Sequence, residues 1–397
     1  MNVFSNKAIH ELRAFADWLS ASDARGVVVR SGKQSGFCAG ADLTELGLAY
    51  DMIVAAPPAT RFDLAYDHFF PLSHAIRRLE TAGKPVAAAI AGVALGGGCE
   101  LALGCHYRVV TGGKRAMLGL PECAVGLLPG AGGTQRMPRL VGLELGLDVL
   151  LLGRNLQGEE ALKVGLVHAV VGEGEEVAAA EAWLLSDAAH CIQPWDMPGT
   201  RPLPYSASAD HIASVRTREL ARMLGHEPAP LAILDCVELG LMQPMDGAIR
   251  SEIAVFARLI QRPEPRNMIR AMFFGKQAFD KAARADAVPA EVLDAKDRSE
   301  AIIRKAAVSC PNLYRAGFLT GNAGNPVQAD IGEDFWFRSE PGVSAAIRNI
   351  LAETAAVTRE FDAERLLLLD YTLAADGIIP PYLGGLSGLS SAAQRAR

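Results

Sequence analysis

The sequence has no closely spaced pairs of cysteines and no long apolar run. Its seven cysteines form no CxxC pair and no regular spacing, a pattern typical of a reduced, intracellular protein rather than of a disulfide framework. No apolar run reaches the roughly 18 residues of a membrane helix, and the N-terminus, MNVFSNKAIHEL, lacks the apolar core of a secretory signal. We therefore expect a cytoplasmic protein without a membrane span.

Further absences narrow the partners and cofactors. A net charge of −6 argues against nucleic acid as the main partner, and no His/Cys/Asp cluster has the spacing of a metal site. No GxGxxG loop follows a strand. The glycine cluster at 321–326, GNAGNP, ends in proline and lacks a preceding apolar strand, so we predict no nicotinamide site.

The most informative stretch is residues 84–136. It opens with an apolar run, 85–95, of the length of a buried strand, and three glycines then precede the helical pattern CELAL. These glycines leave backbone N–H groups accessible at a helix start, a place that suits developing negative charge. Glu100 and Glu122 lie close by in sequence. Such an anion site beside two acids indicates acid/base chemistry on a carbonyl compound.

Three motifs, FCAGAD, ALGGGCELAL and LPECAVGLLPGAGGTQR, resemble the enoyl-CoA hydratase/isomerase (crotonase) family in order and spacing. The resemblance covers residues 1–185. Within the family it is strongest to the hydratase half of the multifunctional fatty-acid oxidation enzymes (their alpha subunit), without the dehydrogenase's dinucleotide-binding domain. It implies an α/β fold with a crotonase (ClpP-like) β-β-α spiral core, followed by a mostly α-helical C-terminal region. In the family a strand precedes the segment NVFS, at which this sequence begins. Two explanations stay open: either the fold tolerates the loss of an edge strand, or the start codon was placed late.

Composition and periodicity predict the organisation of the chain. Four prolines in residues 193–205 mark the best domain boundary. We predict a hydratase domain over 1–190, a Pro-rich linker over 191–205, a helical linker-like region over 206–290 and a helical C-terminal region of unknown role over 291–397, with 384–397 frayed. Apolar spacing predicts strands at 26–30 and 166–171, and helices at 6–19, 134–153, 158–165, 177–189, 208–225, 230–262, 264–284 and 344–373.

The resemblance also implies the site residues. Ala41 and Gly97 match the positions whose backbone N–H groups form the oxyanion hole of the family. Glu100 and Glu122 match its paired glutamates; we assign Glu122 to proton exchange at C2 and Glu100 to orienting and deprotonating the water. A purely structural alternative is that Glu100 favours its helix N-terminus and that Glu122 is a solvated loop acid.

Three more residues are assigned to substrate binding. The Ala39 backbone would lie against the adenine of coenzyme A, and Gly130 would let the backbone approach the catalytic water and substrate. Asp42 belongs to this set, although for Asp42 and Thr134 a helix cap is the favoured role. Thr44 stands where many hydratases have a lysine near coenzyme A.

The implied activity is hydration of a trans-2-enoyl-CoA to a 3-hydroxyacyl-CoA in fatty-acid β-oxidation, with the coenzyme A thioester as substrate and no further cofactor. Two alternatives stay open: a Δ3-Δ2 enoyl-CoA isomerase, and a noncatalytic acyl-CoA-binding or assembly subunit. Retention of both glutamates favours the hydratase, because an isomerase needs one base and a binding module needs none. The implied partners are further copies of this chain or a thiolase-type β-oxidation protein.

Overall fold

A computed structural model describes residues 1–113, 115–202, 208–223, 225–315 and 341–395. The contacts divide the chain into two compact units, one of residues 1–212 with 232–261, the other of 213–231 with the described residues from 262 onward. The segment 232–261 therefore folds with the first unit, although it falls within the helical region predicted for 206–290. The predicted domain boundaries themselves stay predictions.

The first unit combines two small sheets with many helices. Its elements are α1 (Asn6–Ala21), β1 (Val27–Arg30), α2 (Leu43–Ala55), η1 (Pro58–Thr60), α3 (Arg61–Glu80), β2 (Val86–Ile90), β3 (Val93–Leu95), α4 (Gly97–Gly104), β4 (Tyr107–Thr111), β5 (Met117–Gly119), η2 (Pro121–Val125), α5 (Gly133–Val141), α6 (Leu143–Leu152), β6 (Asn155–Gln157), α7 (Gly158–Lys163), β7 (Ala169–Val171), α8 (Glu176–Leu185), η3 (Pro194–Asp196) and α11 (Met245–Leu259). α9 (Ala209–Met223) and α10 (Pro228–Leu241) cross the division between the units.

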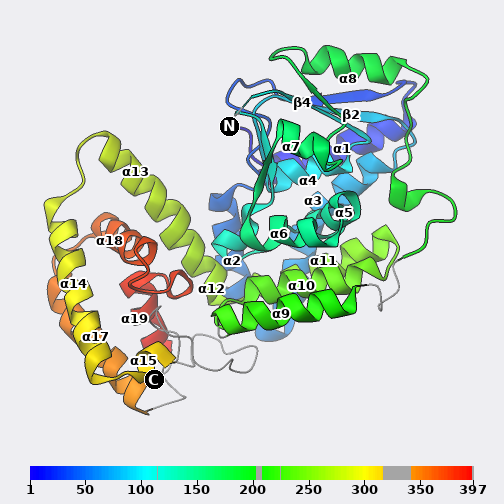
Figure 1. Ribbon diagram of the computed structural model, residues 1–397. Coiled ribbons are helices and arrows are strands. Elements are labelled where there is room, and N and C mark those ends of the chain that lie inside the picture. Colours follow the sequence, from blue (N-terminus) through cyan, green and yellow to red (C-terminus); the bar gives the residue numbers. More distant parts are fainter. Residues whose placement is uncertain (114, 203–207, 224, 316–340, 396–397) are drawn as a thin grey trace. The chain divides into compact units, whose positions relative to one another are not determined.

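The larger sheet is parallel, in the order β1-β2-β4-β7, and the smaller sheet has the order β3-β5-β6 with β5 and β6 antiparallel. Every residue of β2, VAAAI, is buried, as expected for a central strand covered on both faces. Helix α8 packs along β2 and β4, as Figure 1 shows, and places Ala180 and Trp183 against the sheet. The strands at 26–30 and 166–171 and the helices at 6–19, 158–165 and 177–189 are thereby confirmed to within a few residues.

The segments FCAGAD and ALGGGCELAL meet through their backbones. Cys38 forms a parallel bridge with Ala94 on β3, and the Leu95 N–H donates to the Cys38 carbonyl at 2.9 Å. The first turn of α4 then lies directly on this segment, because a Cβ at Gly98 would stand only 2.4 Å from the Cys38 carbonyl oxygen. The glycines after β3 are thus needed for the close approach of α4.

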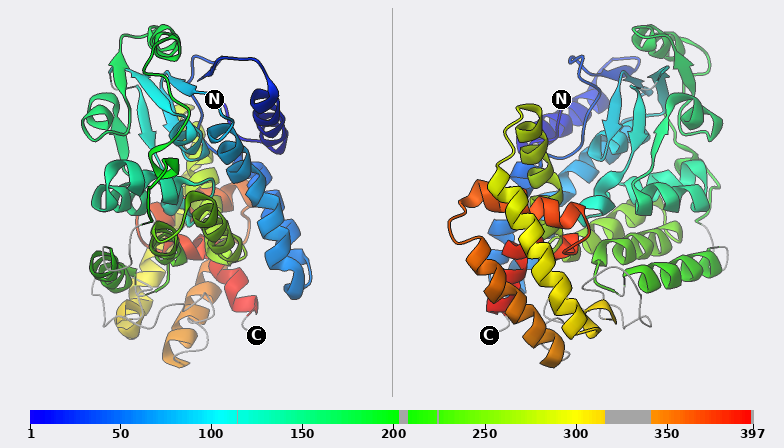
Figure 2. Two further views of the ribbon diagram at one scale, coloured as in Figure 1. Left: turned by 90° about the vertical axis from the view of Figure 1, so that its right-hand side faces the viewer. Right: turned by 60° about the vertical axis from the view of Figure 1, so that its left-hand side comes forward.

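The second unit is helical in its described residues. After α9 come α12 (Pro263–Met268), a π-helical segment η5 (Ile269–Gly275), α13 (Lys276–Arg284), α14 (Ala290–Ser309), α15 (Asn312–Arg315), α17 (Pro341–Val357), α18 (Ala363–Ala375), η6 (Pro381–Leu383) and α19 (Gly385–Arg395). α14 and α17 lie side by side (Figure 2). They share a core with α18 and α19, and its members include Ile303, Ile347, Leu369 and Leu389.

Several predicted boundaries are wrong. The helix expected over 230–262 is two helices, since Pro244 caps α11 in an extended conformation and ends the run. The run 134–153 breaks at Gly142, and 344–373 breaks between α17 and α18. Residues 385–395, expected to fray, form α19 because Leu386 and Leu389 are buried. The glycine cluster at 321–326 lies outside the described residues.

The contact between α4 and the Cys38 segment predicts the effect of a small substitution. Gly98→Ala forces its Cβ against the Cys38 carbonyl oxygen, so we expect a loss of about 1–3 kcal/mol in the free energy of unfolding. Gly32→Ala is the matched control, because a Cβ there meets no atom within 4 Å. Urea unfolding followed by tryptophan fluorescence measures both. Equal stability of the two variants would contradict this packing.

Candidate active site

Glu100 is held in the first turn of α4 by a neighbouring turn of backbone. Its side chain is 2% exposed, and Oε1 accepts hydrogen bonds from the N–H groups of Ala131 at 2.7 Å and Gly133 at 2.8 Å. These donors belong to the turn that leads into α5. Glu100 therefore has a fixed position between α4 and α5.

Glu122 lies on η2, and its side chain reaches the Gly96 turn. Its Oε2 is shielded from solvent and has no hydrogen-bond partner among the described residues. Its Oε1 is close to the backbone of Gly96, because a Cβ at that glycine would lie 2.8 Å from Oε1. Glu122 thus reaches back from its loop to the start of α4, the element that carries Glu100.

The charge of Glu100 acts on Glu122. Burial raises the pKa of Glu100 to about 7, although the two amide donors and the positive charge of Arg136 oppose this shift. Burial also raises the pKa of Glu122 well above its usual range, and the nearby charge of Glu100 raises it further. Because like charges in a site of low dielectric do not ionise together, the pair retains a proton near neutral pH.

The segments of Ala41 and Gly97 adjoin at the same place. A Cβ at Gly40 would lie 3.1 Å from the Leu95 carbonyl oxygen and 3.2 Å from the Gly97 nitrogen. Phe4 bonds on either side of Ala41, donating to the Gly40 carbonyl and accepting from the Asp42 N–H. Among the residues the structure describes, no acceptor is recorded for the N–H of Ala41 or of Gly97. Both amides are therefore available as donors to an outside oxygen.

The predicted substrate-binding residues differ in their surroundings. Ala39 is exposed, and its N–H donates to the Asn2 carbonyl oxygen at 3.0 Å. Asp42 caps α2 by accepting from the N–H groups of Thr44 and Glu45, which confirms the cap. At Gly130, a Cβ would lie 2.9 Å from the Phe256 ring of α11. A side chain at this position would collide with α11.

Sequence reasoning missed a third buried acid, Glu252 on α11. It is 0% exposed and accepts from the N–H groups of Gly132 at 2.6 Å and Thr134 at 3.0 Å. The Thr134 hydroxyl also donates to it, so the expectation that Thr134 caps a helix is wrong; the α5 cap is Gly132. A signal was present, since Glu252 lies within an otherwise apolar buried face of α11 formed by Ala248, Ile249, Ile253 and Phe256.

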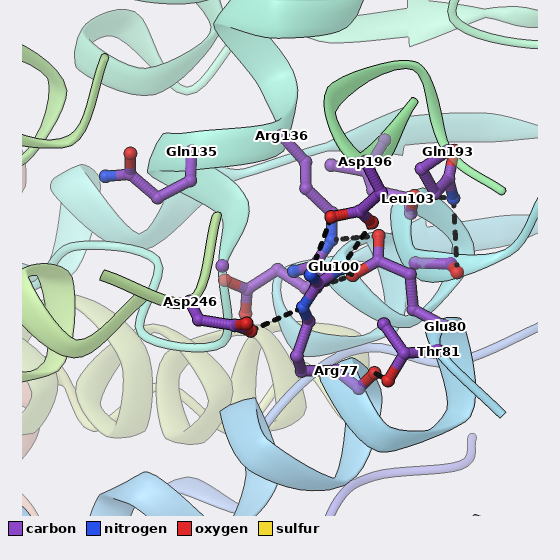
Figure 3. Close-up of polar contacts among 12 residues, drawn as sticks. Arg77, Glu80, Thr81, Glu100, Leu103, Gln135, Arg136, Gln193, Asp196 and Asp246 are labelled. Atoms are coloured by element: carbon purple, nitrogen blue, oxygen red, sulfur yellow. Dashed lines mark hydrogen bonds and ion pairs between the residues drawn. The ribbon is translucent and has the colours of Figure 1, made fainter. Parts of the chain in front are cut away.

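Behind the site, a network of ion pairs fixes the same turn (Figure 3). Arg136 on α5 pairs through two nitrogens with Glu80, at 3.0 and 2.8 Å, and donates from Nη1 to the Ala131 carbonyl oxygen at 3.1 Å. Arg77 extends the network from Glu80 to two acids nearer the surface, Asp196 and Asp246. The turn that holds Glu100 is therefore bonded at its carbonyl side as well as at its amides.

Within the residues that the structure describes, no group of three or more His, Cys, Asp or Glu side chains is placed to hold a metal ion. None of the described helices is long and apolar enough to cross a membrane.

Comparison with known proteins identifies the class. Residues 1–192 match the model of the enoyl-CoA hydratase/isomerase family, and this part of the chain belongs to that family. The two sheets and their covering helices are accordingly the crotonase fold that the sequence predicted, and the described residues of the second unit are helical, as expected for the C-terminal region.

Two curated relatives carry the name fatty acid oxidation complex subunit alpha. The one from Shewanella amazonensis is 36% identical over 300 residues, which are 74% of this chain and 41% of the relative. The one from Shewanella frigidimarina is 35% identical over 283 residues, 68% of this chain and 37% of the relative. The chain thus spans about two fifths of the length of these relatives. Among solved structures, DspI of Pseudomonas aeruginosa is 34% identical over 46% of this chain and 65% of its own, with a TM-score of 0.40.

The buried acids predict how stability depends on pH. The pKa values of Glu100 and Glu252 in the fold, about 7 and about 8, lie above the value of 4.5 for a free side chain. Their contribution to stability is therefore fully present below pH 4.5 and is lost as the pH rises through 7 to 8.

We expect the free energy of unfolding of the first unit to fall between about pH 5 and about pH 9. Urea unfolding followed by tryptophan fluorescence measures it, since Trp18, Trp183 and Trp195, three of the four tryptophans, lie in this unit. Glu100→Gln should show a shallower dependence, because one titrating group is removed. Stability that rises over this interval would contradict the assignment of raised pKa values.

Proposed function

We propose that this chain is a 2-enoyl-CoA hydratase, which adds water to a trans-2-enoyl-CoA to give a 3-hydroxyacyl-CoA. The observation that carries the proposal is the position of Glu122, whose Oε1 reaches the Gly96 turn at the start of α4, and whose pKa is raised by burial and by the nearby charge of Glu100. Membership of residues 1–192 in the hydratase/isomerase family supports the same class of chemistry.

The thioester oxygen would accept hydrogen bonds from the N–H groups of Ala41 and Gly97. As a nucleophile attacks the β-carbon, negative charge builds on this oxygen, and two fixed donors stabilise it. Each donor is worth about 3 kcal/mol in the transition state by analogy with measured oxyanion donors. Gly97 also begins α4, so the positive end of the helix points to the same oxygen.

The two acids would divide the proton transfers. Glu100 orients and deprotonates the water that adds at C3, and Glu122 delivers the proton at C2 from its buried Oε2. Addition from one side, where both acids lie, gives the syn product. A pair that keeps one proton near neutral pH supplies one base and one acid in a single protonation state. Hydration changes no oxidation state, and we propose that it needs neither a nicotinamide nor a metal.

The remaining substrate contacts follow from the sequence. Ala39, exposed beside the site, would present its backbone to the adenine of coenzyme A, and Gly130 would bring the backbone close to the acyl group. Asp42 acts through its cap on α2, the helix that follows Ala41. The names of the curated relatives favour a role in fatty-acid oxidation as part of a complex. We propose a thiolase-type protein or further copies of this chain as partners.

A Δ3-Δ2 enoyl-CoA isomerase is the second candidate. One observation favours it: Oε1 of Glu100 is engaged by two amides, whereas Oε2 of Glu122 has no partner among the described residues, as suits a single base. A noncatalytic acyl-CoA-binding subunit, the third reading, has no use for two acids with raised pKa values.

Glutamine variants distinguish these candidates. With crotonyl-CoA, we expect Glu100→Gln and Glu122→Gln each to lower kcat by about 10²- to 10⁴-fold, because each removes a proton transfer, while KM changes little. Glu181→Gln, an exposed position on α8, is the control that keeps the wild-type rate.

An absorbance assay measures hydration with crotonyl-CoA and isomerisation with a 3-enoyl-CoA. An isomerase would convert the 3-enoyl-CoA, lose that activity in Glu122→Gln and keep it in Glu100→Gln. Acyl-CoA binding without turnover of either substrate would leave only the noncatalytic reading. Hydration that is unchanged in Glu122→Gln would refute the assignment of the acids.

A further inference from the structure

Glu252 and Glu100 share one turn of backbone in a regular way. Four successive N–H groups, from 131 to 134, point to the two carboxyl groups in alternation. Those of Ala131 and Gly133 bond Glu100, and those of Gly132 and Thr134 bond Glu252. The two sets of bonds are linked, because each planar peptide unit that bonds one acid is joined directly to a unit that bonds the other.

The bonding of Glu252 extends beyond these amides. The Gln135 side chain donates from Nε2 to the Thr134 hydroxyl oxygen at 2.8 Å and to the Cys236 carbonyl oxygen at 2.9 Å. The Thr134 hydroxyl oxygen thus accepts a hydrogen bond from Gln135, and the hydroxyl donates its proton to Oε2 of Glu252. Three donors therefore converge on the Glu252 carboxyl group, against two on Glu100.

Glu252 comes from outside the part of the chain that matches the family model, residues 1–192. It is carried by α11, which also packs Phe256 against Gly130 and against Phe69 of α3. α11 thus supplies both an acid and an aromatic ring to the turn that holds Glu100.

From this geometry we propose that Glu252 is a positioning residue for the hydration reaction: it holds the turn 131–134 in the register that presents the Ala131 and Gly133 amides to Glu100. The inference rests on the proposed hydratase function.

In this role Glu252 acts through the turn, and it also places a third carboxyl group beside the pair. Its charge raises the pKa of Glu122, and burial raises its own pKa to about 8. The titratable and charged groups that act on it are Glu100 on α4, Glu122 on η2, Arg136 and Arg139 on α5, and Cys236 on α10.

The direct test is Glu252→Gln in the full chain. The glutamine amide group is a donor, so it cannot accept from both Gly132 and Thr134, and the turn must shift. With crotonyl-CoA we expect kcat to fall about 10- to 100-fold, as for a small misplacement of a catalytic group, with KM changed less than about threefold. We also expect the alkaline limb of the kcat–pH profile to move to lower pH by roughly one unit, because a negative charge beside Glu122 is removed.

Matched variants separate positioning from general destabilisation. Thr134→Val removes one donor to Glu252 and keeps the shape of the side chain; we expect a smaller loss of kcat, and Thr134→Ser should recover most of that loss. Glu181→Gln, with the same change of charge on an exposed helix, should keep both the rate and the pH profile. A kcat and a pH profile of Glu252→Gln that match wild type would overturn the proposal. If Glu252→Gln does not fold, equal kcat of Thr134→Val and Thr134→Ser overturns it.

A second readout does not depend on turnover. If the wild-type chain hydrates no enoyl-CoA, the proposed function fails. The position of Glu252 is then tested by infrared titration of the buried carboxyl groups. In Glu252→Gln, the groups that remain should titrate at lower pH than in wild type. An unchanged titration would show that Glu252 does not act on the pair.

Discussion

The site depends on one run of four backbone amides that holds two buried carboxyl groups at once. Glu100 and Glu252 alternate along the four N–H groups from 131 to 134, at the start of α5. Hydrogen bonds to ionised carboxyl groups and the positive end of a helix both favour negative charge at this place. Burial opposes it, and burial prevails, because the pKa values of both acids remain raised. The outcome is a site that carries exchangeable protons near neutral pH.

The arginine side chains around the turn help to hold it in place. Arg136 is fully buried and paired with Glu80, which is itself joined to Arg77. A buried arginine without such a partner costs several kcal/mol, so the pair is stable only as a unit. Arg136 donates from its third nitrogen, Nη1, to the Ala131 carbonyl oxygen. Its charge also opposes the rise in the pKa of Glu100. The network that stabilises the turn therefore also limits the rise in the pKa of Glu100.

Much of this arrangement could be predicted from the sequence, for identifiable reasons. The glycines at 96–98 indicated a helix start with accessible backbone N–H groups, and α4 does begin at Gly97. The close approach of Gly98 to Cys38 was not predicted. Gly97 and Glu100 lie in the first turn of α4 directly after β3, and Glu122 lies on η2 directly after β5. The roles assigned to Ala41, Gly97, Glu100 and Glu122 remain proposals. Glu252 could not be placed, because its role depends on a contact between segments about 120 residues apart in sequence. Breaks such as the one at Pro244 were missed because apolar periodicity continues across them.

The central claim is that a thioester oxygen binds between the amides of Ala41 and Gly97, beside the paired acids. The most direct measurement is a ¹⁵N–¹H correlation spectrum of the full chain, labelled at alanine and glycine, during titration with acetoacetyl-CoA, a thioester that can bind as its enolate. The account predicts that the amide protons of Ala41 and Gly97 move downfield together as they donate to the charged oxygen. Binding that leaves these two signals in place would contradict it.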